Sequence, residues 1–263
     1  MLEQQIELKR KLDQGEYIFG THNFTGLPML TEAMALCGFD AVWIDMEHTT
    51  VDKREVLNNL IACNEARAAA FVRIPWNDPV LAKPILDMGA DALIFPYIRT
   101  KEDAMLVAAA CDYPPAGIRG YGPQRAASYG LQNALDYVRR DYRSTLRFIQ
   151  LEHIDAVENL DQILEVSGID GYIFGPNDLA GSLGLIGQPR HERALEVTLR
   201  ATDKLRKAGK PFGVSVGYNE QVITWWKEQG ATLLFTGYDI GYVTEGARRT
   251  NENLKRIFGG KGA

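Results

Sequence analysis

The feature that most constrains the fold is a series of short apolar segments, each separated from the next by a stretch with helical spacing. The segments are rich in β-branched and aromatic residues, which is typical of buried strands. They lie at residues 17–20, 41–45, 69–74, 93–95, 146–152, 172–174, 212–216 and 233–235. Eight strands that alternate with helices predict an α/β protein with a (β/α)8 barrel.

A short internal repeat supports this fold. The segments Gly-Phe-Asp-Ala at 38–41, Gly-Ala-Asp-Ala at 89–92 and Gly-Ile-Asp-Gly at 168–171 each end a helix and begin a strand. Gly-Ala-Thr at 230–232 is a weaker copy. A doubly wound open sheet is the alternative, but no Gly-x-Gly-x-x-Gly turn follows the first strand.

We expect one barrel domain over residues 1–263, in which the alternation of strands and helices is interrupted once. Residues 113–145 are rich in proline and glycine and predict a long loop after the fourth strand, at the catalytic face. The expected helices are residues 2–14, 27–36, 51–66, 79–89, 101–111, 155–166, 190–208, 219–228 and 240–257.

Composition excludes some classes of protein. The formal net charge is -5, so a basic nucleic-acid footprint is not expected. No apolar run approaches the roughly 18 residues of a membrane helix, and residues 1–10 have no signal-peptide core. We interpret Cys37, Cys63 and Cys111 as buried thiols, and we expect a cytoplasmic protein.

Polar side chains gather where the predicted strands end. The active sites of such barrels lie at the carboxyl ends of the strands, so this pattern predicts a functional site there. The residues are Asp45, Glu47 and His48 after the second strand, Arg73 in the third, Gln150 and Glu152 in the fifth, and Asn177 and Asp178 after the sixth.

These residues suggest metal-assisted chemistry on a 2-oxo acid. Glu152 and Asp178 suit a hard divalent cation such as Mg²⁺ or Mn²⁺. The cation would act as a Lewis acid, and Arg73 would stabilise the developing enolate. His48 would move protons while Asp45 holds its tautomer. No lysine ends a strand, which argues against a Schiff base.

Each residue also has a structural interpretation. Glu152 could be a buried partner of Arg73. Asp178 could cap a turn, and Asp45 could satisfy backbone donors. His48 could be a satisfied histidine beside the site rather than a base. A structural role is favoured for the remaining histidines, His22, His153 and His191.

Five segments, taken together, resemble the class II metal-dependent pyruvate aldolases of the HpcH/HpaI family. The resemblance runs from about residue 20 to about residue 241. The segments are Ile-Asp-Met-Glu-His at 44–48, Val-Arg-Ile-Pro-Trp-Asn-Asp at 72–78, Tyr-Pro-Pro-Ala-Gly-Ile-Arg-Gly at 113–120, Gln-Leu-Glu at 150–152 and Gly-Pro-Asn-Asp-Leu at 175–179.

The resemblance implies an enzyme that reversibly cleaves 4-hydroxy-2-oxo acids to pyruvate, or a similar 2-oxo acid, and an aldehyde. It implies a role in aromatic or sugar-acid catabolism and a homohexamer, a trimer of dimers, with helix 240–257 exchanged between subunits. Mg²⁺ or Mn²⁺ is the implied cofactor, with Co²⁺ and Zn²⁺ as alternatives.

The family's site residues carry over to matching positions. The resemblance makes Glu152 and Asp178 metal ligands, His48 and Asp45 a catalytic dyad, and Arg73 the contact to the keto oxygen. It places Gln150 beside bound pyruvate, and it places the backbone of Gly175, Pro176 and Asn177 around the carboxylate of pyruvate.

The chain departs from many relatives in the loop at 121–128 and in Val214-Ser215-Val216. Both departures concern the aldehyde half of the substrate. We expect Arg125 to bind, at the catalytic face, an acceptor that carries a carboxylate or several hydroxyl groups. The alternative, for Arg125 and Arg119 alike, is that the arginine anchors the loop to a carboxylate.

Three other functions remain open. A citrate-lyase-like enzyme acting on acyl-CoA would need a basic surface for adenine, and none is obvious. A sugar-phosphate barrel would place phosphate loops after strands seven and eight, where Gly217-Tyr218 and Gly237-Tyr238 are weak candidates. A non-catalytic metal-binding barrel is the third.

Overall fold

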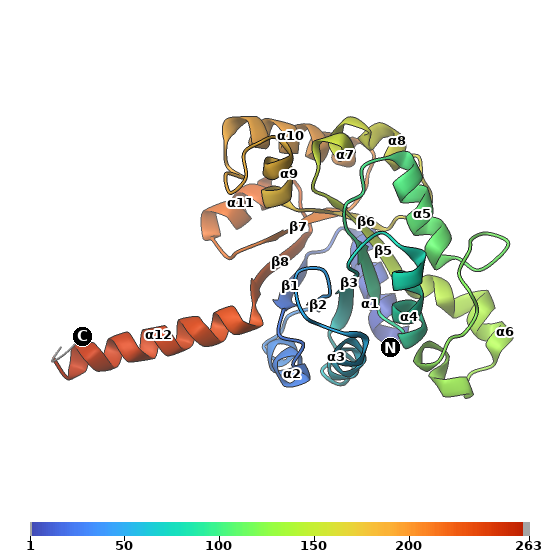
Figure 1. Ribbon diagram of the computed structural model, residues 1–263, viewed down its shortest axis with the longest axis horizontal. Coiled ribbons are helices and arrows are strands. Elements are labelled where there is room, and N and C mark those ends of the chain that lie inside the picture. Colours follow the sequence, from blue (N-terminus) through green and yellow to red (C-terminus); the bar gives the residue numbers. More distant parts are fainter. Residues whose placement is uncertain (1, 260–263) are drawn as a thin grey trace.

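The chain forms a closed barrel of parallel strands, as the sequence predicts. In this computed structural model, which describes residues 2–259, the strands pair in chain order and β1 closes the barrel against β8 (Figure 1). The strands are β1 Ile18–Asn23, β2 Ala41–Asp45, β3 Ala69–Arg73, β4 Ala92–Phe95, β5 Leu146–Leu151, β6 Gly171–Phe174, β7 Phe212–Val216 and β8 Leu233–Tyr238.

Helices follow the strands and surround the barrel. The longer ones are α1 Leu2–Gln14, α2 Pro28–Leu36, α3 Lys53–Glu65, α4 Pro79–Met88, α5 Lys101–Cys111, α10 Glu192–Lys207, α11 Glu220–Glu228 and α12 Asp239–Ile257. The expected helix at 155–166 is two short helices, α7 Ile154–Glu158 and α8 Leu160–Leu164, which meet at Asn159. A further helix, α9 Pro176–Ser182, lies where the sequence predicts only a turn.

Local sequence explains where these helices begin. Asp52 caps α3 in a capping box with Glu55, and Asp78 caps α4, in which Pro79 occupies a tolerated first position. His153 and His191 cap α7 and α10 by accepting backbone N–H groups. The structural interpretation of these two histidines is therefore confirmed.

The barrel interior is filled by large side chains from alternating positions. Trp43, Phe71, Phe148 and Phe235 are fully buried in one cluster with smaller side chains. A Cβ on Gly20 would lie 2.3 Å from the ring of Phe235, so only glycine fits beside that ring. The filled interior leaves the carboxyl end of the barrel for chemistry.

Helix α1 covers the opposite, amino-terminal end. Its Leu8 and Leu12 join the interior cluster, and its Gln5 donates a hydrogen bond to the carbonyl of Ala90, just before β4. Side chains from α1 thus close the amino-terminal end of the barrel, opposite the mouth at which Asp45, Arg73 and Gln150 lie.

The long segment between α5 and β5 contains helical turns rather than being plain loop. These are η1 Arg125–Gly130, α6 Ala134–Asp136, η2 Tyr137–Asp141 and η3 Tyr142–Ser144. The segment follows α5 and leads into β5, so it lies at the amino-terminal ends of the strands. The expectation that it lies at the catalytic face is therefore wrong.

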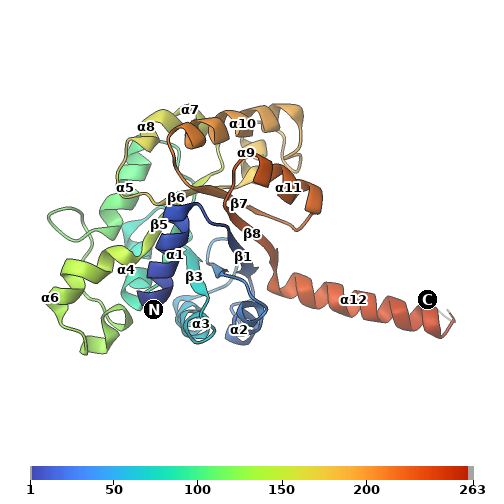
Figure 2. The same ribbon diagram turned by 180° about the vertical axis from the view of Figure 1, so that it is seen from behind.

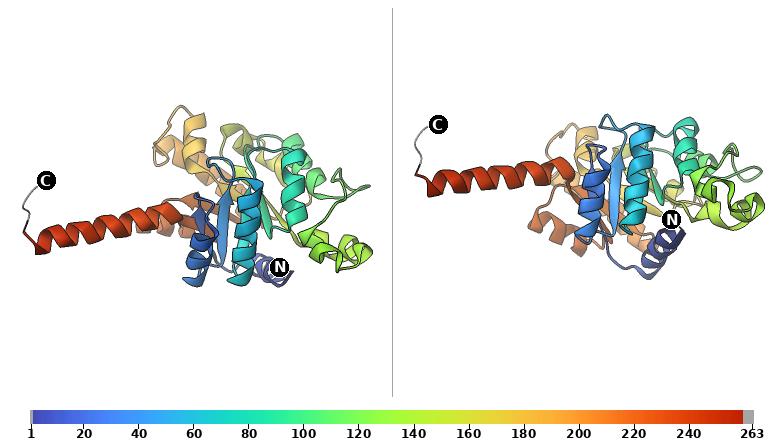
Figure 3. Two further views of the ribbon diagram at one scale, coloured as in Figure 1. Left: turned by 60° about the horizontal axis from the view of Figure 1, so that its bottom comes forward. Right: turned by 90° about the horizontal axis from the view of Figure 1, so that it is seen from below.

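Helix α12 leaves the barrel and extends away from it, as Figure 1, Figure 2 and Figure 3 all show. Ile240, Val243, Leu254 and Ile257 are exposed along this helix. Among the helices of residues 2–259, none has the length and apolar character needed to cross a membrane.

The cysteines are buried in two cases out of three. Cys63 and Cys111 are buried as expected, but Cys37 is exposed because it follows the last turn of α2.

Candidate active site

The strands bring three predicted site residues together at the mouth of the barrel. Asp45 and Arg73 end β2 and β3 and lie in register, while Gln150 comes from β5. All three are buried. Because residues of like parity on parallel strands face the same side, their side chains meet at the carboxyl end of the barrel.

Asp45 and Arg73 form a bidentate ion pair. Arg73 Nε lies 2.7 Å from Asp45 Oδ1, and Nη2 lies 2.6 Å from Oδ2. The guanidinium also lies over the ring of Trp43, 5.2 Å from its centre. Burial opposes the charge on Arg73, but the hydrogen bonds and charge of Asp45, together with the charges of Glu47 and Glu152, outweigh it, so the pKa of Arg73 is raised.

This pairing changes the role expected for Asp45. Both of its carboxylate oxygens are engaged by Arg73, and one also accepts the N–H of Glu47 at 3.0 Å. Within the described residues it makes no hydrogen bond to His48. The prediction that Asp45 holds the tautomer of His48 is therefore wrong for this structure, and Asp45 instead fixes the arginine.

Glu152 is held by an amide and a backbone donor. Gln150 Nε2 donates to Glu152 Oε2 at 2.8 Å, and the N–H of Tyr97 donates to Oε1 at 2.7 Å. Gln150 Oε1 in turn accepts from Arg73 Nη1 at 3.4 Å. Gln150 thus links Glu152 to Arg73, and the simple Glu152–Arg73 pair is not formed.

Gly175 makes room for this carboxylate. A Cβ at Gly175 would lie 2.9 Å from Glu152 Oε2 and from its Cβ. Any larger residue would therefore displace Glu152, which places Gly175 at the site as the sequence predicts.

Negative charge is concentrated around Glu152. The pKa of Glu152 is raised to about 7, chiefly by burial and also by the nearby charges of Glu47 and Asp178, against the opposing effects of the Tyr97 N–H and Arg73. Burial also raises the pKa of Glu47, although Arg73 and His48 oppose this. A divalent cation would offset such a concentration of carboxylates.

The structure places Glu47 in the site, although the sequence alone predicts no role for it. Its Oε2 lies 2.8 Å from Arg73 Nη1, as an ion pair without hydrogen-bond geometry. The sequence feature that could have indicated a site role for Glu47 is its position two residues after Asp45, which continues the alternation of the strand. The strand β2 itself ends at Asp45, so this alternation is not carried by regular strand structure.

Asp178 and Asn177 lie in the first turn of α9 and are exposed. Asp178 makes no hydrogen bond or ion pair within residues 2–259, and no side chain caps α9. The capping interpretation of Asp178 is therefore not supported, and its carboxylate keeps its full capacity to bind a ligand.

His48 lies at the outer edge of the site. Its side chain is 65% exposed, and its Nε2 lies 3.9 Å from Glu47 Oε2. Glu47 is therefore the carboxylate beside this imidazole, in the position that Asp45 was expected to fill.

The structural role expected for His22 is confirmed by its contacts at the mouth of the barrel. His22 lies on β1, with Nδ1 2.7 Å from the carbonyl oxygen of Gly237 and Nε2 2.8 Å from Ser215 Oγ. Burial lowers the pKa of His22 to about 4, so the ring is neutral at pH 7. The carbonyl can only accept, so Nδ1 carries the proton and Nε2 accepts from Ser215.

Arg125 does not reach this site. It is buried, and its Nη1 and Nη2 donate to the carbonyls of Met88 and Leu60, at 3.0 and 3.4 Å. Met88 ends α4 just before β4, so Arg125 lies at the opposite end of the barrel. The predicted contact of Arg125 with an acceptor in its own barrel is wrong. Arg119 pairs with Asp87 at 2.8 Å, which confirms its anchoring interpretation.

Comparison with known proteins agrees with this geometry. The sequence model of the HpcH/HpaI aldolase/citrate lyase family matches residues 25–245. A 4-hydroxy-2-oxo-heptane-1,7-dioate aldolase from Klebsiella pneumoniae is 37% identical over 216 residues, which cover 82% of this chain and 81% of the relative.

Solved structures of the same family superpose closely. An HpcH/HpaI aldolase/citrate lyase family protein from Burkholderia cenocepacia has a TM-score of 0.89 at 30% identity, covering 95% of this chain and 99% of that one. An HpcH/HpaI aldolase from Desulfitobacterium hafniense has a TM-score of 0.86 at 29% identity, covering 94% and 96%.

Fold, site and comparisons together define a (β/α)8-barrel enzyme of the aldolase/citrate lyase type. The chain belongs to the HpcH/HpaI aldolase/citrate lyase family.

Proposed function

We propose that the chain is a class II aldolase that reversibly cleaves 4-hydroxy-2-oxo acids to pyruvate, or a close analogue, and an aldehyde. The observation that carries the proposal is the chain of contacts Arg73–Gln150–Glu152 at the barrel mouth. It sets a fixed cation beside a buried carboxylate, as enolate chemistry requires. The named activity of the Klebsiella pneumoniae relative supports the same reaction.

Glu152 and Asp178 would hold a divalent cation. They fit one because Asp178 is exposed and unpaired in the described chain, while burial and neighbouring carboxylates raise the pKa of Glu152. No cluster of three or more His, Cys, Asp or Glu side chains in residues 2–259 has metal-site spacing. Two carboxylates suffice for Mg²⁺ or Mn²⁺, which keep water or substrate as other ligands. When bound, the ion supplies Lewis acidity toward the 2-oxo group.

The residues of the chain itself have distinct roles in the cleavage reaction. His48 accepts the proton of the 4-hydroxyl group as the C3–C4 bond breaks. The electron pair of that bond passes to the pyruvate fragment as an enolate, and Arg73 stabilises its oxygen. Asp45 and Trp43 hold the guanidinium in place. Transfer of a proton to C3, which balances the one that His48 removed, directly from His48 or through solvent, then yields pyruvate.

The rival function within the family is carbon–carbon cleavage of an acyl-CoA. The sugar-phosphate alternative is weaker, because the Gly237 carbonyl is occupied by His22 and Gly217 lines a largely apolar cavity. The test is pyruvate release from a 4-hydroxy-2-oxo acid, measured with and without chelator. We expect turnover that chelator abolishes and Mg²⁺ or Mn²⁺ restores. Cleavage of an acyl-CoA substrate with no release of pyruvate would favour the rival.

The exposed apolar residues of α12 suggest how the protein assembles. We propose that α12 packs against a second copy of the chain and that the assembly is a trimer of dimers, because Ile240, Val243, Leu254 and Ile257 lack cover in the single chain. Light scattering of the full chain should give a hexamer, and removal of residues 243–263 should give a smaller species. A full-length monomer would contradict this proposal.

A further inference from the structure

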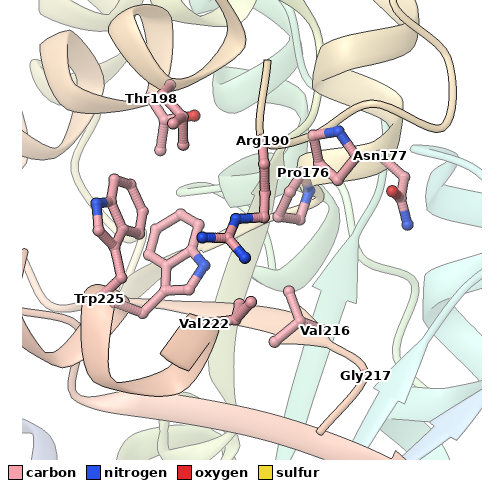
Figure 4. Close-up of a pocket in the computed structure, with 11 residues that line it drawn as sticks. Pro176, Asn177, Arg190, Thr198, Val216, Gly217, Val222 and Trp225 are labelled. Atoms are coloured by element: carbon pink, nitrogen blue, oxygen red, sulfur yellow. The ribbon is translucent and has the colours of Figure 1, made fainter. Parts of the chain in front are cut away.

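A cavity of about 270 Å³ lies beside the catalytic mouth, behind the first turn of α9. Figure 4 shows it between that turn, the end of β7, α10 and α11. Its lining residues are Pro176, Asn177, Pro189, Arg190, Leu195, Thr198, Val216, Gly217, Val222, Trp225 and Trp226.

Most of the walls of this cavity are apolar. Val216, Val222 and the indoles of Trp225 and Trp226 contribute aliphatic and aromatic surface. Thr198 adds little polarity, because its hydroxyl donates to the carbonyl of Ala194 at 2.9 Å. Such a surface favours a ligand with an apolar body.

Arg190 supplies the charge. It is the one charged residue in the lining, and Figure 4 shows its guanidinium extending into the cavity toward α11. Within residues 2–259, no carboxylate pairs with Arg190, and no Asp or Glu lines the cavity. Arg190 is exposed, so its guanidinium lies at the solvent side of an otherwise largely apolar lining. A guanidinium in that position without a protein anion is a ready partner for the carboxylate of a ligand.

The cavity is coupled to the catalytic site through a shared turn. Pro176 and Asn177 form one wall of it, and Asp178 is the next residue of α9. A ligand in the cavity would therefore contact the turn that carries the proposed metal ligand.

We propose that this cavity binds a small carboxylate with an apolar aryl or alkyl body. The carboxylate pairs with Arg190, and the body packs against Trp225, Trp226 and Val222. The ligand is either the far end of the acceptor aldehyde or a separate free acid. The first of these sources rests on the proposed aldolase function, whereas binding itself does not.

The experiment titrates the full-length protein with benzoate, and with benzamide as a neutral isostere. Intrinsic tryptophan fluorescence and calorimetry follow binding, because Trp225 and Trp226 line the cavity. We expect saturable binding of benzoate that Arg190→Gln weakens at least tenfold, with little effect on benzamide. Arg193→Gln is the matched control, since Arg193 is exposed at the start of α10 and does not line the cavity.

Kinetics distinguish the two sources. If the cavity holds the acceptor, benzoate competes with 4-carboxybenzaldehyde, and Arg190→Gln raises KM for that aldehyde but not for benzaldehyde. If it holds a free acid, benzoate changes turnover without competing. Both results support the site, and a failed aldolase assay leaves the binding result intact.

Three results would overturn the proposal. One is no saturable binding of benzoate, and another is binding that Arg190→Gln leaves unchanged. The third is a change of oligomeric mass in Arg190→Gln without any benzoate binding to the native protein, which would make this face a subunit interface.

Discussion

Arg73 and Asp45 face each other from adjacent strands and share two hydrogen bonds, of 2.7 and 2.6 Å. This pair determines the geometry of the mouth. With Nε and Nη2 engaged, only Nη1 is directed toward Glu47 and Gln150. A positive charge is thus fixed beside the carboxylates before any substrate binds.

The first prediction concerns this pair. Arg73→Lys keeps the charge but loses the planar fork, so it cannot hold Asp45 with two bonds. We expect kcat/KM to fall by about 10²–10³-fold, the range for loss of one oriented donor to an oxyanion. Steady-state kinetics would test this. A variant within threefold of the native rate would show that charge alone suffices.

Glu152 provides the second prediction. Glu152→Gln preserves the shape of the side chain but removes its charge, so metal binding and turnover should both be lost. Calorimetric titration with Mn²⁺ measures the first and pyruvate release the second. Glu158→Gln is the control, because Glu158 is exposed in the following helix. If Glu152→Gln bound Mn²⁺ with native affinity, Glu152 would not be a metal ligand.

The third prediction separates proton transfer from binding. His48 is exposed at the edge of the site, so His48→Ala should fold normally. Turnover should fall by roughly 10²–10⁴-fold, the usual range for general acid–base catalysis, while affinity for Mn²⁺ and pyruvate is retained. Unchanged turnover would assign the proton transfer to another group.

His22 gives a prediction of pH dependence. Its pKa is lowered from 6.5 to about 4 in the folded protein, so the unfolded chain binds the proton more readily. Stability is therefore complete above about pH 6.5 and is lost as the pH falls toward 4. Between pH 7 and 4, His22 should account for about 3 kcal/mol of lost unfolding free energy.

His22→Gln tests this directly. A glutamine can donate to Gly237 and accept from Ser215 without titrating, so it mimics the neutral ring. Denaturant unfolding at pH 7 and pH 4 should show a smaller loss of stability in the variant. Equal losses in both proteins would mean that other groups cause the acid sensitivity of the native protein.

Much of the fold and part of the site could be predicted from the sequence. The strands were recognisable because short apolar runs rich in β-branched residues are typical of parallel strands buried on both faces. The strand ends then located Asp45, Arg73, Gln150 and Glu152 without any distance being known. Two general properties were enough to place these residues at one end of the barrel: side chains alternate along a strand, and parallel strands all point in the same direction.

Pairings and long-range placements were harder to predict. Spacing alone could not show that Arg73, rather than His48, takes the carboxylate of Asp45. The structural role expected for His22 is confirmed by its two hydrogen bonds. Its place at the mouth could not be predicted, because β1 runs three residues beyond the predicted end, to Asn23, and a polar strand end has the same composition as a loop. The prediction that Arg125 lies at the catalytic face is wrong because the loop follows α5, which returns the chain to the other end of the barrel.

The central claim is that this mouth makes an enolate from pyruvate, and exchange of the methyl protons of pyruvate in D₂O tests it without any aldehyde. In proton NMR, the methyl signal should decay when both the native protein and Mg²⁺ or Mn²⁺ are present. It should persist with chelator, and with Glu152→Gln under the same conditions. A methyl signal that stays constant with native protein and saturating metal would contradict the account.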